Sequence, residues 1–193
     1  MKKLFITLVA VSIFLLSSCS TTIRDYKGTK PVFNIKEYFN GPVVAWGMVQ
    51  DYNEKLTRRF CVEMTGTWEG NKGVLDEYFY WADGEKSRRV WKLTVNDDGT
   101  ISGSADDVVG VASGESSGLA FQWNYVLKVK VDDSEYEFSI DDWMYQFDQY
   151  RLFNRSFMSK FGFEVAEITL FFDKEQPLRK CDKNIPDTRK KPN

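Results

Sequence analysis

Hydrophobic and polar residues alternate strictly along residues 119–131, the clearest periodic segment of the chain. One parity carries only apolar and aromatic side chains, which are Leu119, Phe121, Trp123, Tyr125, Leu127, Val129 and Val131. Successive strand residues point to opposite faces of a sheet, so this pattern predicts a strand with one buried and one solvated face. Residues 135–140 repeat the alternation after the turn sequence Asp-Asp-Ser at 132–134, so we expect the two segments to form a hairpin.

Short turn-forming sequences separate the apolar segments from Phe33 onward. They are rich in Asp, Asn and Gly and lie at 51–54, 69–72, 83–84, 96–99 and 132–134. Turn signals at intervals of roughly 10–15 residues, without sustained helical periodicity, predict an antiparallel all-β sandwich or barrel. A short opening helix is compatible with residues 33–40.

Some charged residues share the parity of apolar strand positions instead of the polar parity. They are Arg58, Glu77, Arg89 and Asp142, whereas their neighbours Arg59, Asp76, Arg88 and Asp141 follow the polar parity. A buried charge persists only when it is paired, so an interior network of arginine–carboxylate pairs is one explanation. The other is that each charge lies at a strand end, near the mouth of a barrel. With the aromatic residues of the same faces, the candidate ligand-binding interior comprises Arg58, Glu77, Arg89, Trp91, Trp123, Tyr125, Tyr136 and Asp142.

The N-terminus has the pattern of a bacterial lipoprotein signal peptide. Two lysines precede the apolar run 4–16, which is shorter than the roughly 20 residues that a membrane-spanning helix needs. The sequence Leu-Ser-Ser-Cys at 16–19 resembles a lipobox, in which the chain is cut before the cysteine and the cysteine is acylated. We therefore expect Cys19 to be lipidated; the alternative is an ordinary cleavage site followed by a chance cysteine.

These features predict where the protein is located in the cell and how its chain is divided into segments. Ser20 follows Cys19 in place of the Asp that commonly retains lipoproteins at the inner membrane, so we expect lipid anchoring to the outer membrane, on its periplasmic face. Residues 1–18 are the expected signal peptide and residues 19–32 a lipidated tether. Residues 33–174 form the expected β-barrel domain, and residues 175–193 a polar C-terminal tail.

The other two cysteines remain as a possible pair once Cys19 is consumed. Cys61 and Cys181 are then an even number of thiols in an oxidising compartment, which favours a disulfide. The alternative is two unpaired thiols, one in a strand and one in the tail.

The sequence lacks the residues that several kinds of catalytic and metal site require. The chain has no histidine, which removes Ser-His-Asp and Cys-His catalysis and most zinc sites. The adjacent acids Asp106-Asp107 and Asp141-Asp142 would point to opposite faces of a strand, so neither dipeptide is by itself a carboxylate dyad. The net charge of −2, with no dominant basic patch, gives no support for a nucleic-acid partner. We predict no enzymatic activity, no cofactor and no metal.

Longer motifs carry a resemblance to a known family. They are "AWGMVQD" (45–51), "RRF" (58–60), "LDEYFYWADGEKSRRVW" (75–91), "ADDVVGVASG" (105–114), "DDWMYQFD" (141–148) and "NRSFMSKFG" (154–162). Together they are similar to the bacterial lipoproteins of the domain of unknown function 3833. The chain departs from the family pattern at Gly118-Leu119, where the family tends to have Gly-Asn. The resemblance implies a β-barrel that is attached to a membrane. Genes of the family often lie near genes for fatty-acid-modifying enzymes, which is a weak indication of a lipid ligand. The family has no established activity.

We therefore expect a single antiparallel up-and-down barrel, lipocalin- or calycin-like, of roughly eight to ten strands. The predicted function is binding of an apolar or amphipathic envelope molecule such as a fatty acyl chain or lipid. The alternative is a packed barrel that serves as a scaffold in an envelope protein complex, with no small ligand. A ligand site should have a mostly apolar cavity of roughly 300–1,000 Å³, which distinguishes the two.

Overall fold

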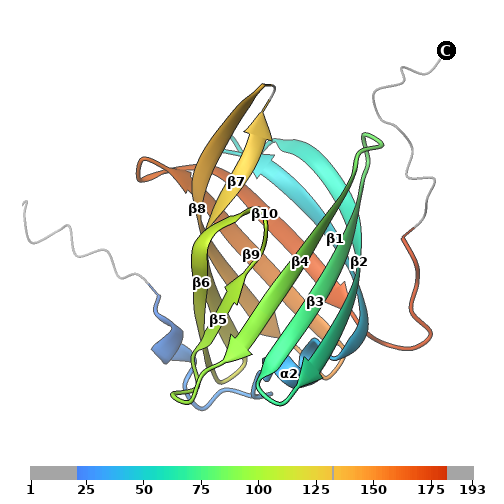
Figure 1. Ribbon diagram of the computed structural model, residues 1–193, viewed down its shortest axis with the longest axis vertical. Coiled ribbons are helices and arrows are strands. Elements are labelled where there is room, and N and C mark those ends of the chain that lie inside the picture. Colours follow the sequence, from blue (N-terminus) through green and yellow to red (C-terminus); the bar gives the residue numbers. More distant parts are fainter. Residues whose placement is uncertain (1–20, 132, 182–193) are drawn as a thin grey trace, which may run out of the picture.

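The computed structural model describes residues 21–131 and 133–181, which form one closed antiparallel barrel of ten strands (Figure 1). The predicted signal peptide, Cys19 and residues 182–193 lie outside the described residues. The strands are β1 (Gly41–Asp51), β2 (Leu56–Glu69), β3 (Lys72–Trp81), β4 (Lys86–Val95), β5 (Ile101–Ser104), β6 (Val108–Ser117), β7 (Ala120–Val131), β8 (Ser134–Gln146), β9 (Arg151–Lys160) and β10 (Phe163–Asp173). Two short helices, η1 (Ile23–Tyr26) and α2 (Ile35–Tyr38), precede them.

Each strand pairs with the next along the chain, and β1 pairs with β10 to close the barrel. This confirms the expected up-and-down barrel and decides between the sandwich and the barrel that the turn spacing allowed. The predicted hairpin joins β7 to β8, with Tyr125 opposite Ile140 and Val131 opposite Ser134. Closure pairs every strand on both sides, so the barrel leaves no unpaired sheet edge.

The helix α2 closes one end of the barrel, which lies at the bottom of Figure 1. Asn34 caps this helix by accepting hydrogen bonds from the next turn. The flanking Phe33 stacks on Phe121 of β7 with ring centroids 5.3 Å apart, and Phe39 meets Phe172 of β10 edge-on at 5.8 Å. These aromatic contacts fix α2 across the bottom of the interior, so the opposite end is the mouth.

The segment that precedes α2 packs on the outside of the barrel wall. Ile23 of η1 is buried together with Ala120 and Trp143, and the Tyr26 ring lies 6.0 Å from the Trp143 ring. These residues belong to the segment 19–32 that we expect to be a lipidated tether. The side chains of Ile23 and Tyr26 pack there because each covers apolar or aromatic surface of β7 and β8 that water would otherwise contact.

A disulfide joins Cys61 of β2 to Cys181, which confirms the predicted pair. Both cysteines are buried with Val44, and Tyr80 packs against them. The first residues of the predicted C-terminal tail are thereby held against the outer face of β2. Within residues 21–131 and 133–181, no helix is both long and apolar enough to cross a bilayer.

Candidate functional site

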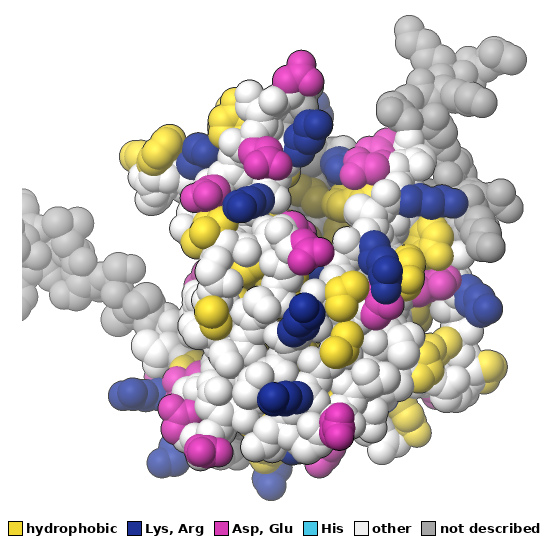
Figure 2. Space-filling view, viewed as in Figure 1, with side chains coloured by type: hydrophobic (Ala, Val, Ile, Leu, Met, Phe, Trp, Pro, Cys, Tyr) yellow, Lys and Arg dark blue, Asp and Glu magenta, His cyan; other side chains and the backbone are white. Residues whose placement is uncertain are grey.

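The barrel encloses a cavity of about 500 Å³ that extends from α2 toward the turns at the opposite end. Figure 2 shows a hollow in the upper part of the molecule with hydrophobic side chains inside it. Its walls are the inward faces of the strands, which carry mainly apolar side chains such as Phe60, Val62, Leu75, Leu127, Ile168 and Leu170. The barrel is therefore not filled by its own side chains.

Aromatic residues shape the middle of the cavity. Trp91 meets Trp123 and Tyr125 edge-on, with ring centroids 5.6 Å and 5.4 Å apart. Two glycines make room for Trp123, because a Cβ added at Gly103 or Gly114 would lie within 2.9 Å or 2.5 Å of its ring. Gly103 and Gly114 are thus needed because a larger side chain would collide with Trp123. Gly118 is needed for a different reason, since its backbone has a φ of +54.

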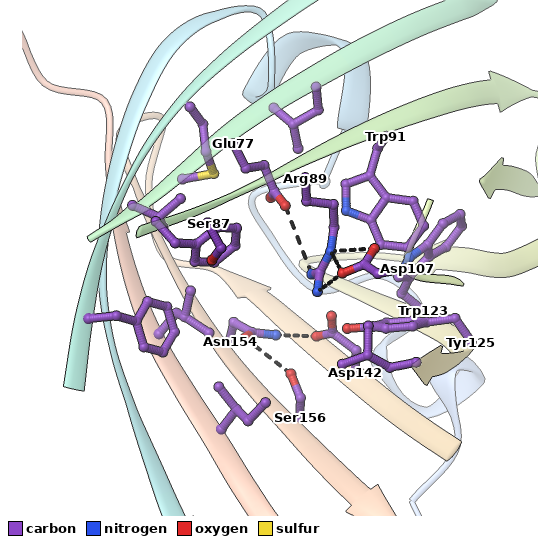
Figure 3. Close-up of a pocket in the computed structure, with 18 of the residues that line it drawn as sticks. Glu77, Ser87, Arg89, Trp91, Asp107, Trp123, Tyr125, Asp142, Asn154 and Ser156 are labelled. Atoms are coloured by element: carbon purple, nitrogen blue, oxygen red, sulfur yellow. Dashed lines mark hydrogen bonds and ion pairs between the residues drawn. The ribbon is translucent and has the colours of Figure 1, made fainter. Parts of the chain in front are cut away.

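A cationic group stands at the centre of the polar part of the cavity (Figure 3). The Nε of Arg89 on β4 donates to both carboxylate oxygens of Asp107, at 3.0 and 2.8 Å, and its Nη2 lies 2.8 Å from Oδ2. Glu77, its neighbour on β3, is 3.9 Å from Nη1. Glu77 is 9% exposed, and its Oε2 has no hydrogen-bond partner among the described residues.

A second polar group lies across the cavity on β8 and β9 (Figure 3). Asp142, 6% exposed, accepts a hydrogen bond from the side-chain amide of Asn154. Asn154 also donates to the carbonyl oxygen of Trp143 at 3.1 Å, and the hydroxyl of Ser156 donates to Asn154 Oδ1 at 3.3 Å. Asp142 is thus held by neutral groups, with no salt bridge to a described lysine or arginine.

Burial changes the acid–base properties of these groups. Desolvation, opposed by the charge of Arg89, raises the pKa of Glu77 to about 7. Desolvation also raises the pKa of Asp142 to about 7, against the hydrogen bonds from Asn154 and Ser156. Burial raises the pKa of the Tyr125 hydroxyl, so this group stays neutral. The cavity therefore holds two carboxyl groups that change charge near neutral pH.

The structure brings together most of the candidate interior residues but not all of them. Glu77, Arg89, Trp91, Trp123, Tyr125 and Asp142 line the cavity. Arg58 also lines it, but near the mouth, where it pairs with Asp83 and Glu85 at 2.7 Å and lies 3.7 Å from the Trp81 ring. Of the two explanations for the in-phase charges, pairing in the interior fits Arg89, and position near the mouth fits Arg58.

Tyr136 requires a correction. It has the inward parity of β8, but it does not line the cavity and is 40% exposed. The amine of Lys160 lies 4.6 Å from its ring. Strand parity alone cannot show how far a strand continues past the cavity. The N-terminal end of β8, where Tyr136 lies, extends beyond the cavity.

Asn154, Ser156 and Asp107 form polar contacts in the cavity but were not among the site residues expected from the sequence. Asn154 and Ser156 share the inward parity of Leu152 and Met158 on β9, so the phase test that selected Asp142 would also have found them. Asp107 lies in the turn between β5 and β6, where no strand parity applies. No cluster of three or more His, Cys, Asp or Glu residues suited to a metal ion occurs in the described part of the chain.

The closed ten-stranded barrel, open at one end and plugged by a short helix at the other, is a lipocalin-like barrel. The chain belongs to the family described as Protein of unknown function (DUF3833), which it matches over residues 13–174. No curated protein matches the sequence.

Two similar solved structures have low sequence identity to this chain. An S-type phycobiliprotein lyase from Guillardia theta superposes with a TM-score of 0.53 and 9% identity, covering 76% of this chain and 95% of that chain. Lobster apocrustacyanin A1 gives a TM-score of 0.37 and 15% identity, covering 79% of this chain and 67% of that chain. At such identity the likeness to the lyase shows the fold alone.

Proposed function

We propose that this protein is a periplasm-facing lipoprotein of the outer membrane that binds an apolar or amphipathic envelope molecule, such as a fatty acyl chain or lipid, inside its barrel. The observation that carries the proposal is the cavity of about 500 Å³. Cavities of roughly 300–1,000 Å³ with mainly apolar walls are typical of small-molecule sites. A barrel used only as a packed scaffold would need no such space, so the cavity favours the ligand-binding alternative.

The docked N-terminal segment supports a particular orientation at the membrane. A chain spans at most about 3.6 Å per residue, so a lipidated Cys19 would hold η1 within roughly 15 Å of the acyl chains. η1 lies toward the end of the barrel that α2 closes (Figure 1). In this arrangement the mouth faces away from the anchoring membrane, and ligand would exchange with the periplasm or with a partner there.

Native mass spectrometry of the protein purified from its membrane, followed by lipid extraction, tests the proposal. We expect a bound molecule that organic solvent removes and that has a long apolar portion. Ile168→Trp would fill the cavity from β10, whereas Thr169→Trp would add the same ring on the outer parity of the same strand.

The two variants should separate binding from mere stability. Ile168→Trp is expected to reduce the co-purified ligand and the binding of a fluorescent apolar probe at least tenfold, while Thr169→Trp keeps both near the wild-type level. A wild-type protein that carries no ligand and binds no apolar probe would instead support the packed-scaffold alternative.

A further inference from the structure

Arg58, Arg89, Lys128 and Lys130 are the cations that line the cavity. Of these, Arg89 is the one that acts on both Glu77 and Asp142, and its guanidinium is engaged with both oxygens of Asp107. Glu77 has a hydrogen bond from Trp91 and a 3.9 Å contact between its Oε2 and Arg89, and Asp142 has only neutral hydrogen-bond donors. Figure 3 shows Glu77 and Asp142 on different sides of the Arg89–Asp107 pair, both within the cavity.

The Oε2 atom of Glu77 is the strongest single indication of a missing partner. A buried carboxylate oxygen normally accepts hydrogen bonds, and leaving it without one costs free energy. The charged and titratable groups around Glu77 are Arg89 on β4, Asp107 before β6, Tyr125 on β7 and Asp142 on β8. Of these groups only Arg89 is a cation; its Nε and Nη2 contact Asp107, and its Nη1 is 3.9 Å from Glu77 Oε2, beyond hydrogen-bond distance.

We infer that the cavity selects amphipathic ligands whose polar end is a protonated amine, which donates hydrogen bonds to Glu77 and Asp142 while the hydrocarbon portion contacts the apolar walls. This inference rests on the proposed function and names its ligand class. An ammonium head supplies three donors and one positive charge, which match an unpartnered carboxylate oxygen and a second buried carboxylate.

A fatty-acid carboxylate fits the same place poorly. Arg89 has the parity expected of an anchor for such a head, but Asp107 already neutralises it. A carboxylate placed beside Arg89 would meet the charge of Asp107 and, from neutral pH upward, the charges of Glu77 and Asp142 as well. Like charges at short range in a poorly solvated site repel strongly. The polar lining therefore discriminates by the sign of the ligand's charge.

Amine binding should be coupled to release of protons. A cation beside Glu77 and Asp142 favours their ionised forms, so protons leave the carboxyl groups when the ligand enters at or below neutral pH. An alkylamine keeps its own charge, because an unperturbed primary amine has a pKa of about 10.4. Affinity for the amine should accordingly rise as the pH increases from 6 to 8.

Three probes with the same chain and different heads test the inference on delipidated protein. We would titrate dodecylammonium, dodecanol and dodecanoate below their micelle concentrations and follow the fluorescence of the cavity tryptophans. We expect dodecylammonium to bind at least tenfold more tightly than dodecanoate. Calorimetry in two buffers of different ionisation enthalpy should show proton release with the amine and none with dodecanol.

Glu77→Gln keeps the shape of the side chain and removes its charge. It should weaken dodecylammonium at least tenfold and leave dodecanol within about twofold. The matched control is Asp76→Asn, because Asp76 faces outward and pairs with Arg88 at 2.8 Å; it should change neither affinity. Tighter binding of dodecanoate than of dodecylammonium, or an unchanged amine affinity in Glu77→Gln, would overturn the inference. Failure of all three probes to bind would contradict the proposed function itself.

Discussion

Arg89 donates to both carboxylate oxygens of Asp107, although Glu77 is its direct partner in the register of β3 and β4. The guanidinium thus ties β4 to the turn before β6 and keeps only a 3.9 Å contact with Glu77. Bidentate pairing of this kind is geometrically specific and strong. One arginine therefore organises the polar half of the cavity and leaves a carboxylate oxygen available.

Removing this arginine should be far more damaging than removing its sequence neighbour. In Arg89→Met, Glu77 and Asp107 lose their cation. Asp107 is 38% exposed, but Glu77 is buried, and leaving a buried charge without its partner costs about 3–5 kcal/mol of unfolding free energy. Arg88 lies on the outer face, with 53% of its side chain exposed, and pairs with Asp76, so Arg88→Met should cost at most about 1 kcal/mol. Urea denaturation of both variants measures the difference. Equal midpoints would show that the two arginines do not occupy the faces described.

The disulfide should contribute substantially to stability. Cys61 and Cys181 are 120 residues apart in sequence, and closing a loop of that length stabilises by about 4–5 kcal/mol in the chain-entropy model. We expect Cys181→Ala to lower the urea midpoint of the oxidised protein and to make it insensitive to reductant. Alkylation of both thiols in denatured, unreduced wild-type protein would contradict the pairing.

Gly66 should tolerate no side chain, because a Cβ there would lie 1.7 Å from the carbonyl oxygen of Phe39. That carbonyl also accepts the indole hydrogen bond of Trp68, at 3.0 Å. Gly66→Ala must therefore displace the segment that closes the barrel, at an expected cost of about 1–3 kcal/mol. Urea denaturation and Trp68 fluorescence measure it. Thr65→Ala, at an exposed position, is the control and should leave both unchanged.

Local sequence signals were sufficient to predict an antiparallel all-β fold, and the family resemblance favoured a barrel over a sandwich. Strict alternation over 119–131 placed β7, and the turn sequences fell at five of the strand connections. Both signals are local, because strand parity and turn chemistry depend on neighbouring residues. Meander topology then follows readily, since consecutive strands joined by short turns pair with each other.

The contacts of the site depend on distant residues, and the sequence predicted them only in part. Parity correctly placed Glu77, Arg89 and Asp142 inside the barrel. Parity could not show that Arg89 would pair with Asp107, because Asp107 lies in a turn whose position depends on closure of the barrel. Nor could it show that the aromatic residues leave a cavity, since packing of side chains from opposite walls is a property of the whole barrel.

Lipidation of Cys19, which lies outside the described residues, is testable in cells. We expect a palmitate analogue to label the wild-type protein and not Cys19→Ser, and the variant to be poorly retained in membranes, because one acylated residue supplies the anchor. Ser20→Asp is the companion variant; it should stay labelled and move to inner-membrane fractions on a sucrose gradient. Labelling of Cys19→Ser would contradict the lipobox interpretation.

The ligand-free barrel should lose stability as the pH rises from 5 to 8. Glu77 and Asp142 have ordinary pKa values of 4.5 and 3.8 and values of about 7 in the folded protein. Between these values the folded state binds more protons than the unfolded state, so the free energy of unfolding decreases with pH. This stability is fully present below about pH 4, falls as the pH rises toward 7, and is lost above pH 7; the loss between pH 5 and 8 is on the order of 3 kcal/mol for each group.

Urea denaturation at pH 5, 6, 7 and 8 measures this slope, and charge-neutral variants identify its source. The double variant Glu77→Gln and Asp142→Asn should flatten the profile, because neither position can then titrate. Asp76→Asn should keep the slope: the hydrogen bond from Arg88 lowers the pKa of Asp76, so its contribution is lost only in more acidic solution. Dodecylammonium at saturation should also flatten or reverse the wild-type profile, since a bound cation favours the ionised carboxyls. A wild-type stability that rises between pH 5 and 8 without ligand would show that these carboxyls are not desolvated in the empty barrel.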